Sequence, residues 1–212
     1  IVRERAEELG VEFSFGEGAS EWSEAPDGGY LLHTETEDSE AQSASGSRTQ
    51  SGDGEASTYG VDKILVAVGR QPVTDGLDLK NAGIETDERG FIETDNRTRT
   101  VVEHVHAVGD VAGDPMLAHA ASNEGIVAAE VIAGEPAALD RQAVPAAVFT
   151  DPEIGTVGMT EAEAEEAGFE PAVGEMPFNA SGRAMTTGHT EGFVRIVADE
   201  ETGFVLGGQI VG

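Results

Sequence analysis

The stretch HVHAVGDVAGDPMLAHAAS, residues 104–122, constrains the fold of this chain more than any other. Its apolar run Val105–Val108 predicts a short buried strand, which Gly109-Asp110 ends on a carboxylate. Open α/β sheets bind ligands at this carboxyl edge. Asp114-Pro115 predicts the start of a helix, since Asp is a favoured N-cap and Pro suits the first helical position. We expect this helix to end at Gly134.

This arrangement places an acid beside a helix N-terminus, and the pair suits a flavin. Asp110 is a candidate acceptor for hydrogen bonds from ribityl hydroxyls. The helix start offers backbone N–H groups to the N1–C2=O edge of the ring, where a reduced flavin is negative and the helix dipole contributes about 0.3–2 kcal/mol. Those groups would come from Met116, Leu117, Ala118 and His119. The alternative is an ordinary strand–turn–helix in which Asp110 only caps a turn.

Acidic residues dominate the composition and restrict the partners. The chain has 41 Asp and Glu against 12 Lys and Arg, a net charge of -29. Such a surface repels nucleic acid and anionic membranes, so we expect neither as a partner. The acids are scattered through the chain instead of forming a tail. They suit a solvated surface in high salt, where the Debye length is about 3 Å at 1 M, so a halophilic cytoplasm is our hypothesis.

Several chemistries are excluded by what these residues lack. There is no cysteine, hence no disulfide, thiolate zinc site or dithiol redox centre within them. The five histidines lack metal-site spacing, and no Ser or Cys nucleophile with motif support accompanies His106 or His119, so we predict no metal site and no catalytic residue. No apolar run approaches the about 20 residues that span a bilayer. Both ends look cut, so we expect an internal piece of a longer protein.

Local patterns predict the remaining elements. The helical ones are residues 1–9 and a capping box that starts at Thr160-Glu161-Ala162-Glu163. Strands are expected over residues 11–15, 19–24, 29–34, 61–68, 91–94, 192–198 and 203–211, the last two as an antiparallel pair. Residues 35–58 lack apolar side chains, so we expect a flexible loop there.

Three phrases resemble one family, the FAD-dependent pyridine nucleotide–disulfide oxidoreductases. They are VAVGRQP at residues 66–72, AVGD followed by PMLAH at residues 107–119, and VPAAVFTDPEIGTVGMT at residues 144–160. The resemblance implies an α/β fold, part of a flavoprotein with two dinucleotide-binding domains, followed by the start of an α+β interface domain. It implies that residues 1–68 are the second half of the NAD-binding domain, residues 69–143 the closing segment of the FAD-binding domain, and residues 144–212 the first part of the interface (dimerisation) domain.

The resemblance also implies an activity and its cofactors. PMLAH is similar to the branch that oxidises dihydrolipoamide, and glutathione or mercuric reductase-like enzymes remain alternatives. FAD and NAD are implied as cofactors, with Gly69 close to the nicotinamide unless it is an ordinary turn glycine. Arg70 is expected to pair with an acid or contribute to binding. The implied partners are a homodimer mate and a small-molecule or lipoyl-domain substrate, in a cytoplasmic 2-oxoacid dehydrogenase complex.

The family's redox cysteine pair, its two glycine-rich motifs and its His–Glu pair are missing from these residues. The chain alone therefore cannot carry out the reaction. A second hypothesis follows, in which the chain is an acidic, non-catalytic binding module that keeps the architecture without the cofactor.

The charge analysis predicts a salt dependence. We expect the melting temperature to rise with KCl concentration, because screening relieves the repulsion between acids on a surface of net charge -29. Thermal denaturation in increasing KCl measures this directly. A melting temperature that does not rise would contradict the halophilic interpretation.

Overall fold

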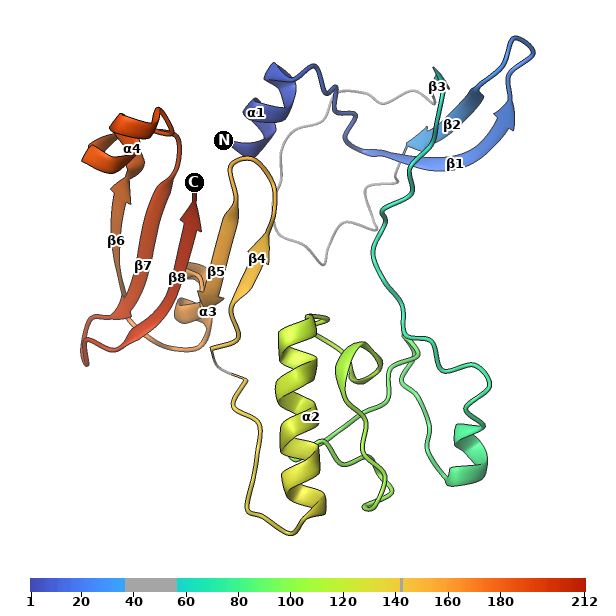
Figure 1. The fold of residues 1–212 in the computed structure, drawn as a ribbon, viewed down its shortest axis with the longest axis vertical. Coiled ribbons are helices and arrows are strands. Elements are labelled where there is room, and N and C mark those ends of the chain that lie inside the picture. The colour runs from blue at the N-terminus through green and yellow to red at the C-terminus, as the bar shows by residue number, and fades with distance from the viewer. Residues whose placement is uncertain (37–56, 142) are drawn as a thin grey trace. The chain divides into compact units, whose positions relative to one another are not determined.

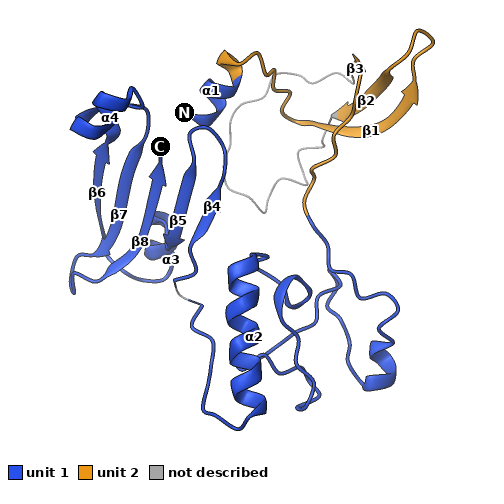
Figure 2. Ribbon diagram, in the orientation of Figure 1, with its two compact units in different colours: residues 1–6, 70–212 blue, residues 7–69 orange. Residues whose placement is uncertain are grey.

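The computed structural model describes residues 1–36, 57–141 and 143–212 (Figure 1). These residues form two compact units, one of residues 7–69 and one of residues 1–6 with 70–212 (Figure 2). The predicted loop over residues 35–58 lies almost entirely outside the described residues. Within the described ranges, no helix has both the length and the apolar character needed to cross a bilayer.

The unit of residues 7–69 contains an antiparallel sheet of three strands in the order β1-β2-β3. The strands are β1 (Glu17–Glu24), β2 (Tyr30–Thr36) and β3 (Thr58–Val61). The first two confirm the strands predicted over residues 19–24 and 29–34. Trp22 of β1 and Tyr30 of β2, diagonal neighbours near the turn, pack edge to face with ring centroids 5.5 Å apart.

Two strands predicted in the first third of the chain are wrong. Residues 11–15 form no strand, although the rings of Phe13 and Phe15 stack 5.7 Å apart. Of residues 61–68, only Val61 belongs to a strand, and Leu65 and Val68 are 91% and 92% exposed. An apolar run becomes a buried strand only where a ladder of hydrogen bonds pairs it, and among the described residues no strand pairs with residues 62–68. The helix predicted over residues 1–9 is confirmed as α1 (Val2–Glu8).

The core of residues 70–143 is built mainly from turns. The buried side chains of Ile84, Ile92 and Ala107 form its centre, with partly buried neighbours Leu79, Val102, Val105, Val111 and Ala112 packed around it. Two short 3₁₀ helices, η1 (Leu79–Ala82) and η2 (Gly109–Ala112), contribute to it. The strands predicted over residues 91–94 and 105–108 are wrong, since each contributes only one isolated bridge residue, Ile92 opposite Thr86 and His106 opposite Arg99.

Helix α2 (Ala118–Ile132) is the longest helix among the described residues. Its end agrees with the predicted stop at Gly134, which adopts a φ of 90°. The predicted start is wrong: Leu117, not Asp114, is the N-cap, and Pro115 precedes the helix on a cis peptide bond instead of occupying its first position. The Met116 carbonyl, just before the helix, accepts a hydrogen bond from Arg70, 46 residues away. The local sequence pattern gives no information on that contact.

The last part of the chain forms an antiparallel sheet of five strands in the order β4-β5-β8-β7-β6. The expected sheet and its final strand pair are thereby confirmed. The strands are β4 (Ala146–Val148), β5 (Ile154–Gly158), β6 (Pro171–Pro177), β7 (Phe193–Asp199) and β8 (Val205–Val211). The helical elements α3 (Glu161–Glu166), η3 (Phe178–Ala180) and α4 (Gly182–Thr187) lie between them in sequence, and Val197, Ala164 and Ala184 are buried.

The predicted capping box at the start of α3 is confirmed. The Thr160 backbone N–H and hydroxyl both donate to the Glu163 carboxylate, each at 2.8 Å, while the Glu163 N–H donates to the Thr160 hydroxyl. The bond from the Thr160 N–H, followed by that from its hydroxyl, lowers the pKa of Glu163. The sequence signal was sufficient because all the partners lie within four consecutive residues.

The turn between β7 and β8 is closed by Asp199. Its carboxylate accepts from the Thr202 hydroxyl at 2.5 Å and from the Thr202 N–H at 3.1 Å. The hydroxyl bond is the main reason that the pKa of Asp199 lies below its usual value. A carboxyl whose pKa is lowered by folding adds stability above its unfolded pKa, about 3.9, and loses that contribution as the pH falls through its folded pKa.

Replacing Thr202 therefore has a pH-dependent effect. In Thr202→Val the pKa of Asp199 returns toward its usual value, so we expect a lower melting temperature than wild type near neutral pH. The difference should narrow as the pH falls below about 4. Thermal denaturation of the protein across this range measures it, with Thr190→Val, in the loop that precedes the other end of β7, as the control. A difference that stays constant with pH would contradict the role assigned to the Asp199 carboxylate.

Candidate functional site

The candidate site lies where the Gly109-Asp110 turn packs against α2. Gly109 adopts a φ of 75°, and a Cβ added to it would lie 3.2 Å from the Ala121 Cβ in the first turn of the helix. The Gly109 N–H donates to Glu124 Oε2 at 2.7 Å. Glycine is therefore favoured here both by backbone conformation and by the close approach. The turn is held against the first two turns of α2.

Asp110 follows Gly109 and is exposed. In the described part of the chain, no group makes a hydrogen bond or ion pair with its side chain, so both carboxylate oxygens are available as acceptors. Its neighbours Val111 and Ala112 pack on the buried core instead. The turn thus anchors its apolar side in the fold and presents its acid to solvent.

The start of α2 is uncapped. Leu117, the N-cap, has extended backbone angles and provides no side-chain hydrogen bond, and the first turn contains no acid. The Leu117 N–H donates to the Pro115 carbonyl, and the first backbone bond into the helix runs from the Ala121 N–H to the Leu117 carbonyl. Between them, the amides of Ala118, His119 and Ala120 carry the positive end of the helix dipole, with Ala118 and His119 exposed.

Arg70 fixes the chain just before this helix. Its Nη1 donates to the Met116 carbonyl at 2.7 Å. The sequence left open whether Arg70 pairs with an acid or contributes to binding; here its recorded partner is a backbone carbonyl. Gly69 ends the other unit with a φ of 111°, and a Cβ added to it would meet no atom within 4 Å.

The two histidines near the site have structural partners. His119 Nε2 donates to the Pro145 carbonyl at 2.8 Å, so the ring faces the chain leading into β4 while the backbone N–H stays at the helix start. His106 Nδ1 is 2.9 Å from the hydroxyl of Thr98, a residue only 1% exposed. This contact supports the expectation that His106 has a packing role.

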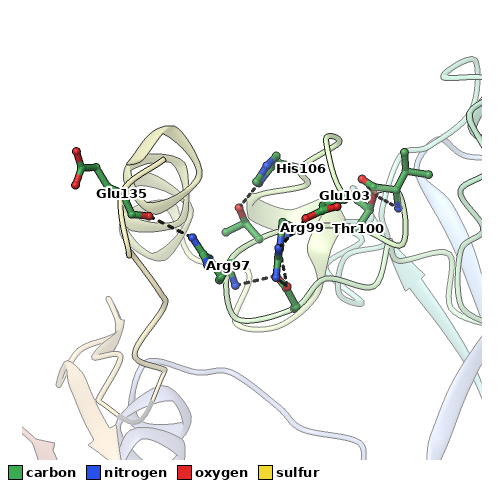
Figure 3. A network of polar contacts seen from close by, with 9 residues as sticks. Arg97, Arg99, Thr100, Glu103, His106 and Glu135 are labelled. Carbon is green, nitrogen blue, oxygen red and sulfur yellow. Dashed lines mark hydrogen bonds and ion pairs between the residues drawn. The ribbon is translucent and has the colours of Figure 1, made fainter. Parts of the chain in front are cut away.

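A polar network secures the turn that precedes the site and joins it to the far end of α2 (Figure 3). Arg97 Nη2 donates to the Glu135 carbonyl at 3.2 Å, and the Leu139 N–H donates to the Asn96 carbonyl at 2.7 Å. Arg99 pairs with Asp95 at 2.8 Å and with Glu103 at 3.4 Å. The helix is therefore tied to the preceding loops at both of its ends.

Glu124, a buried acid bonded to the site turn, was not predicted from the sequence. In a chain with 41 acids, nothing in composition sets it apart. A signal was nevertheless present: Ala120, Glu124, Val127 and Ala128 follow helical spacing and all four are buried, so the acid stands in an otherwise apolar stripe. Clusters of three or more His, Cys, Asp or Glu suited to a metal do not occur in the described ranges.

Comparison with known proteins identifies the class. Residues 1–125 match the family described as pyridine nucleotide-disulphide oxidoreductase, and residues 144–212 match the dimerisation domain of the same family. The chain belongs to the pyridine nucleotide–disulphide oxidoreductases. The family resemblance and the fold class expected from the sequence are confirmed.

The relatives give a more specific indication. The chain is 65% identical, over its whole length, to the dihydrolipoyl dehydrogenase of Haloferax volcanii and 59% identical to that of Halobacterium salinarum. It spans 42% and 41% of those two proteins. Among solved structures it resembles LpdA from Mycobacterium tuberculosis, with a TM-score of 0.81 at 26% identity over 99% of this chain and 41% of that one. It also resembles the HOCl-induced flavoprotein disulfide reductase RclA from Escherichia coli, with a TM-score of 0.78 at 27% identity over 99% of this chain and 44% of that one.

The packing of the turn on α2 predicts opposite effects at two glycines. Gly109→Ala should lower the melting temperature, because Ala in the left-handed region costs about 1–2 kcal/mol and its Cβ also crowds Ala121. Gly125 lies within α2, and a Cβ added to it meets no atom within 4 Å. Gly125→Ala should therefore raise the melting temperature, since Ala is favoured over Gly in helices by about 0.8–1 kcal/mol. Equal effects of the two substitutions in thermal denaturation would contradict this geometry.

Proposed function

We propose that this chain is part of a dihydrolipoyl dehydrogenase, which transfers electrons from dihydrolipoamide to NAD. The observation that carries the proposal is the 65% identity with a relative of that name over the whole chain. Because these residues include no cysteine, the redox dithiol is supplied from outside them. FAD, when bound, supplies the electron relay between the dithiol and NAD.

The residues of the candidate site fit FAD. An exposed carboxylate suits the ribityl hydroxyls, and Asp110 provides one that has no partner in the part of the chain that the structure describes. Uncapped amides suit the electron-rich N1–C2=O edge of the ring, and the start of α2 provides them. The set proposed to contact FAD is Asp110, Met116, Leu117, Ala118 and His119. Because the Leu117 N–H already donates to the Pro115 carbonyl, the amides offered to the ring are those of Ala118, His119 and their neighbour Ala120.

The electrostatics favour the reduced cofactor. The positive end of the α2 dipole stabilises negative charge placed near the first turn, by about 0.3–2 kcal/mol. No acid in that turn opposes the effect. Asp110 lies on the separate turn that packs beside the helix. Its negative charge is therefore not part of the first turn of α2.

The remaining assignments follow from the same proposal. Residues 1–68, 69–143 and 144–212 are assigned to the NAD-binding, FAD-binding and interface domains, and Gly69 to the approach of the nicotinamide. The match of residues 144–212 to a dimerisation domain supports a homodimer. A lipoyl-domain or small-molecule substrate, a 2-oxoacid dehydrogenase complex and a cytoplasmic location complete the proposal.

An assay of the full-length protein separates this activity from its rivals. We expect NAD reduction with dihydrolipoamide as the donor, and little turnover of glutathione disulfide or mercuric ion with a reduced nicotinamide cofactor. The reverse pattern would favour a glutathione or mercuric reductase-like enzyme. Absence of bound flavin in the purified full-length protein would favour the non-catalytic binding module.

Asp110→Ala in the full-length protein tests the site. Losing a hydrogen bond to a charged acceptor costs about 1.5–3 kcal/mol, so we expect the dissociation constant for FAD to rise about 10- to 100-fold. Fluorescence titration of the apoprotein with FAD measures the dissociation constant. Glu166→Ala removes another exposed acid, on α3, and should leave FAD binding unchanged. Equal affinity of Asp110→Ala and wild type would contradict the assignment.

A further inference from the structure

Glu124 is an acid buried on the face that α2 turns to the rest of its unit. The residue is 8% exposed, and the other buried residues of the helix are Ala120, Val127 and Ala128. Burying a carboxylate is costly unless hydrogen bonds or an opposite charge compensate it. The acidic composition of the surface therefore does not explain why an acid is buried at this position.

Both oxygens of Glu124 have a partner. Oε2 accepts from the Gly109 N–H at 2.7 Å, which is a short, charge-assisted hydrogen bond. Oε1 lies 3.6 Å from Arg141 Nη2, and that guanidinium is partly exposed. Arg141 thus compensates the buried charge from one side, while the other oxygen remains directed to the backbone of the turn.

The bonded amide belongs to the residue immediately before Asp110. Gly109 opens η2 with a φ of 75°, a conformation that fixes the direction in which the chain leaves the turn. Asp110 itself has no side-chain partner among the described residues, so nothing but the backbone holds its carboxylate in place. The hydrogen bond that holds the Gly109 amide therefore also restricts the orientation of Asp110.

We propose that Glu124 is a positioning residue for the flavin site, which holds Asp110 at a fixed place beside the uncapped start of α2. The inference rests on the proposed function. Because Glu124 projects from the second turn of the same helix whose first turn offers the amides, one side chain sets the spacing between the two halves of the site. Its action on the cofactor passes through Asp110 and not through direct contact.

The proposal is tested with FAD titrations of the full-length apoprotein. Glu124→Ala should weaken FAD binding about tenfold, and by no more than Asp110→Ala does, because it acts only by misplacing the Asp110 carboxylate. Glu124→Gln keeps an acceptor for the Gly109 amide, so it should restore most of the affinity. Glu130→Ala, an exposed acid on the same helix, is the matched control and should bind FAD like wild type.

A double-mutant cycle distinguishes positioning from general destabilisation. If Glu124 acts through Asp110, the Asp110→Ala/Glu124→Ala variant binds FAD no more weakly than Asp110→Ala alone. If the two losses multiply, Glu124 acts elsewhere and the proposal is overturned. Should Glu124→Ala fail to fold, the same cycle with Glu124→Leu, which keeps bulk but removes the acceptor, provides the comparison.

The outcomes separate this inference from the proposed function. If Asp110→Ala weakens FAD binding but neither Glu124 variant does, the positioning role fails and the flavin site stands. If wild type binds FAD and Asp110→Ala binds it equally well, both the site assignment and the positioning role fail. Normal affinity in Glu124→Gln together with weak, non-additive binding in Glu124→Ala supports the proposal.

Discussion

The close packing of a glycine turn on a helix is the constraint on which the candidate site depends. Gly109 approaches Ala121 so closely that a side chain would crowd the helix, and its backbone conformation disfavours other residues as well. This contact brings together a carboxylate and a set of amides that have no partner among the described residues. Exposed carboxylates and uncapped helix starts are each common in proteins. Together they suit a ligand that has hydroxyl groups at one end and a polarised ring edge at the other.

Basic residues are scarce in this acidic chain, and several of them brace α2. Arg70 donates to the Met116 carbonyl just before the helix, Arg97 donates to the Glu135 carbonyl just after it, and Arg141 pairs with Glu124 between them. Two of these contacts are to carbonyl oxygens, which carry no net charge. These three guanidinium groups thus hold the helix and its neighbouring loops together, and most acids among the described residues are exposed.

Local patterns predicted the parts of the structure whose partners are close in sequence. The capping box at Thr160 and the last strand pair are of this kind, and both are found as expected. The apolar run over residues 61–68 failed as a strand because pairing depends on another strand, which local pattern does not contain. The start of α2 was also predicted wrongly, and the chain just before it is held by Arg70, a residue far away in sequence. Glu124 was missed because only burial distinguishes it from other acids.

Hydrogen exchange at the start of α2, with and without FAD, tests the central claim most directly. In the full-length protein, the amides of Ala118, His119 and Ala120 should exchange more slowly when FAD is bound. Amides in the last turn of α2, which lie well along the helix from the proposed contact, should change less. If the protein holds FAD and the first turn of α2 exchanges no more slowly than in the apoprotein, the helix end does not contact the flavin and the account is contradicted.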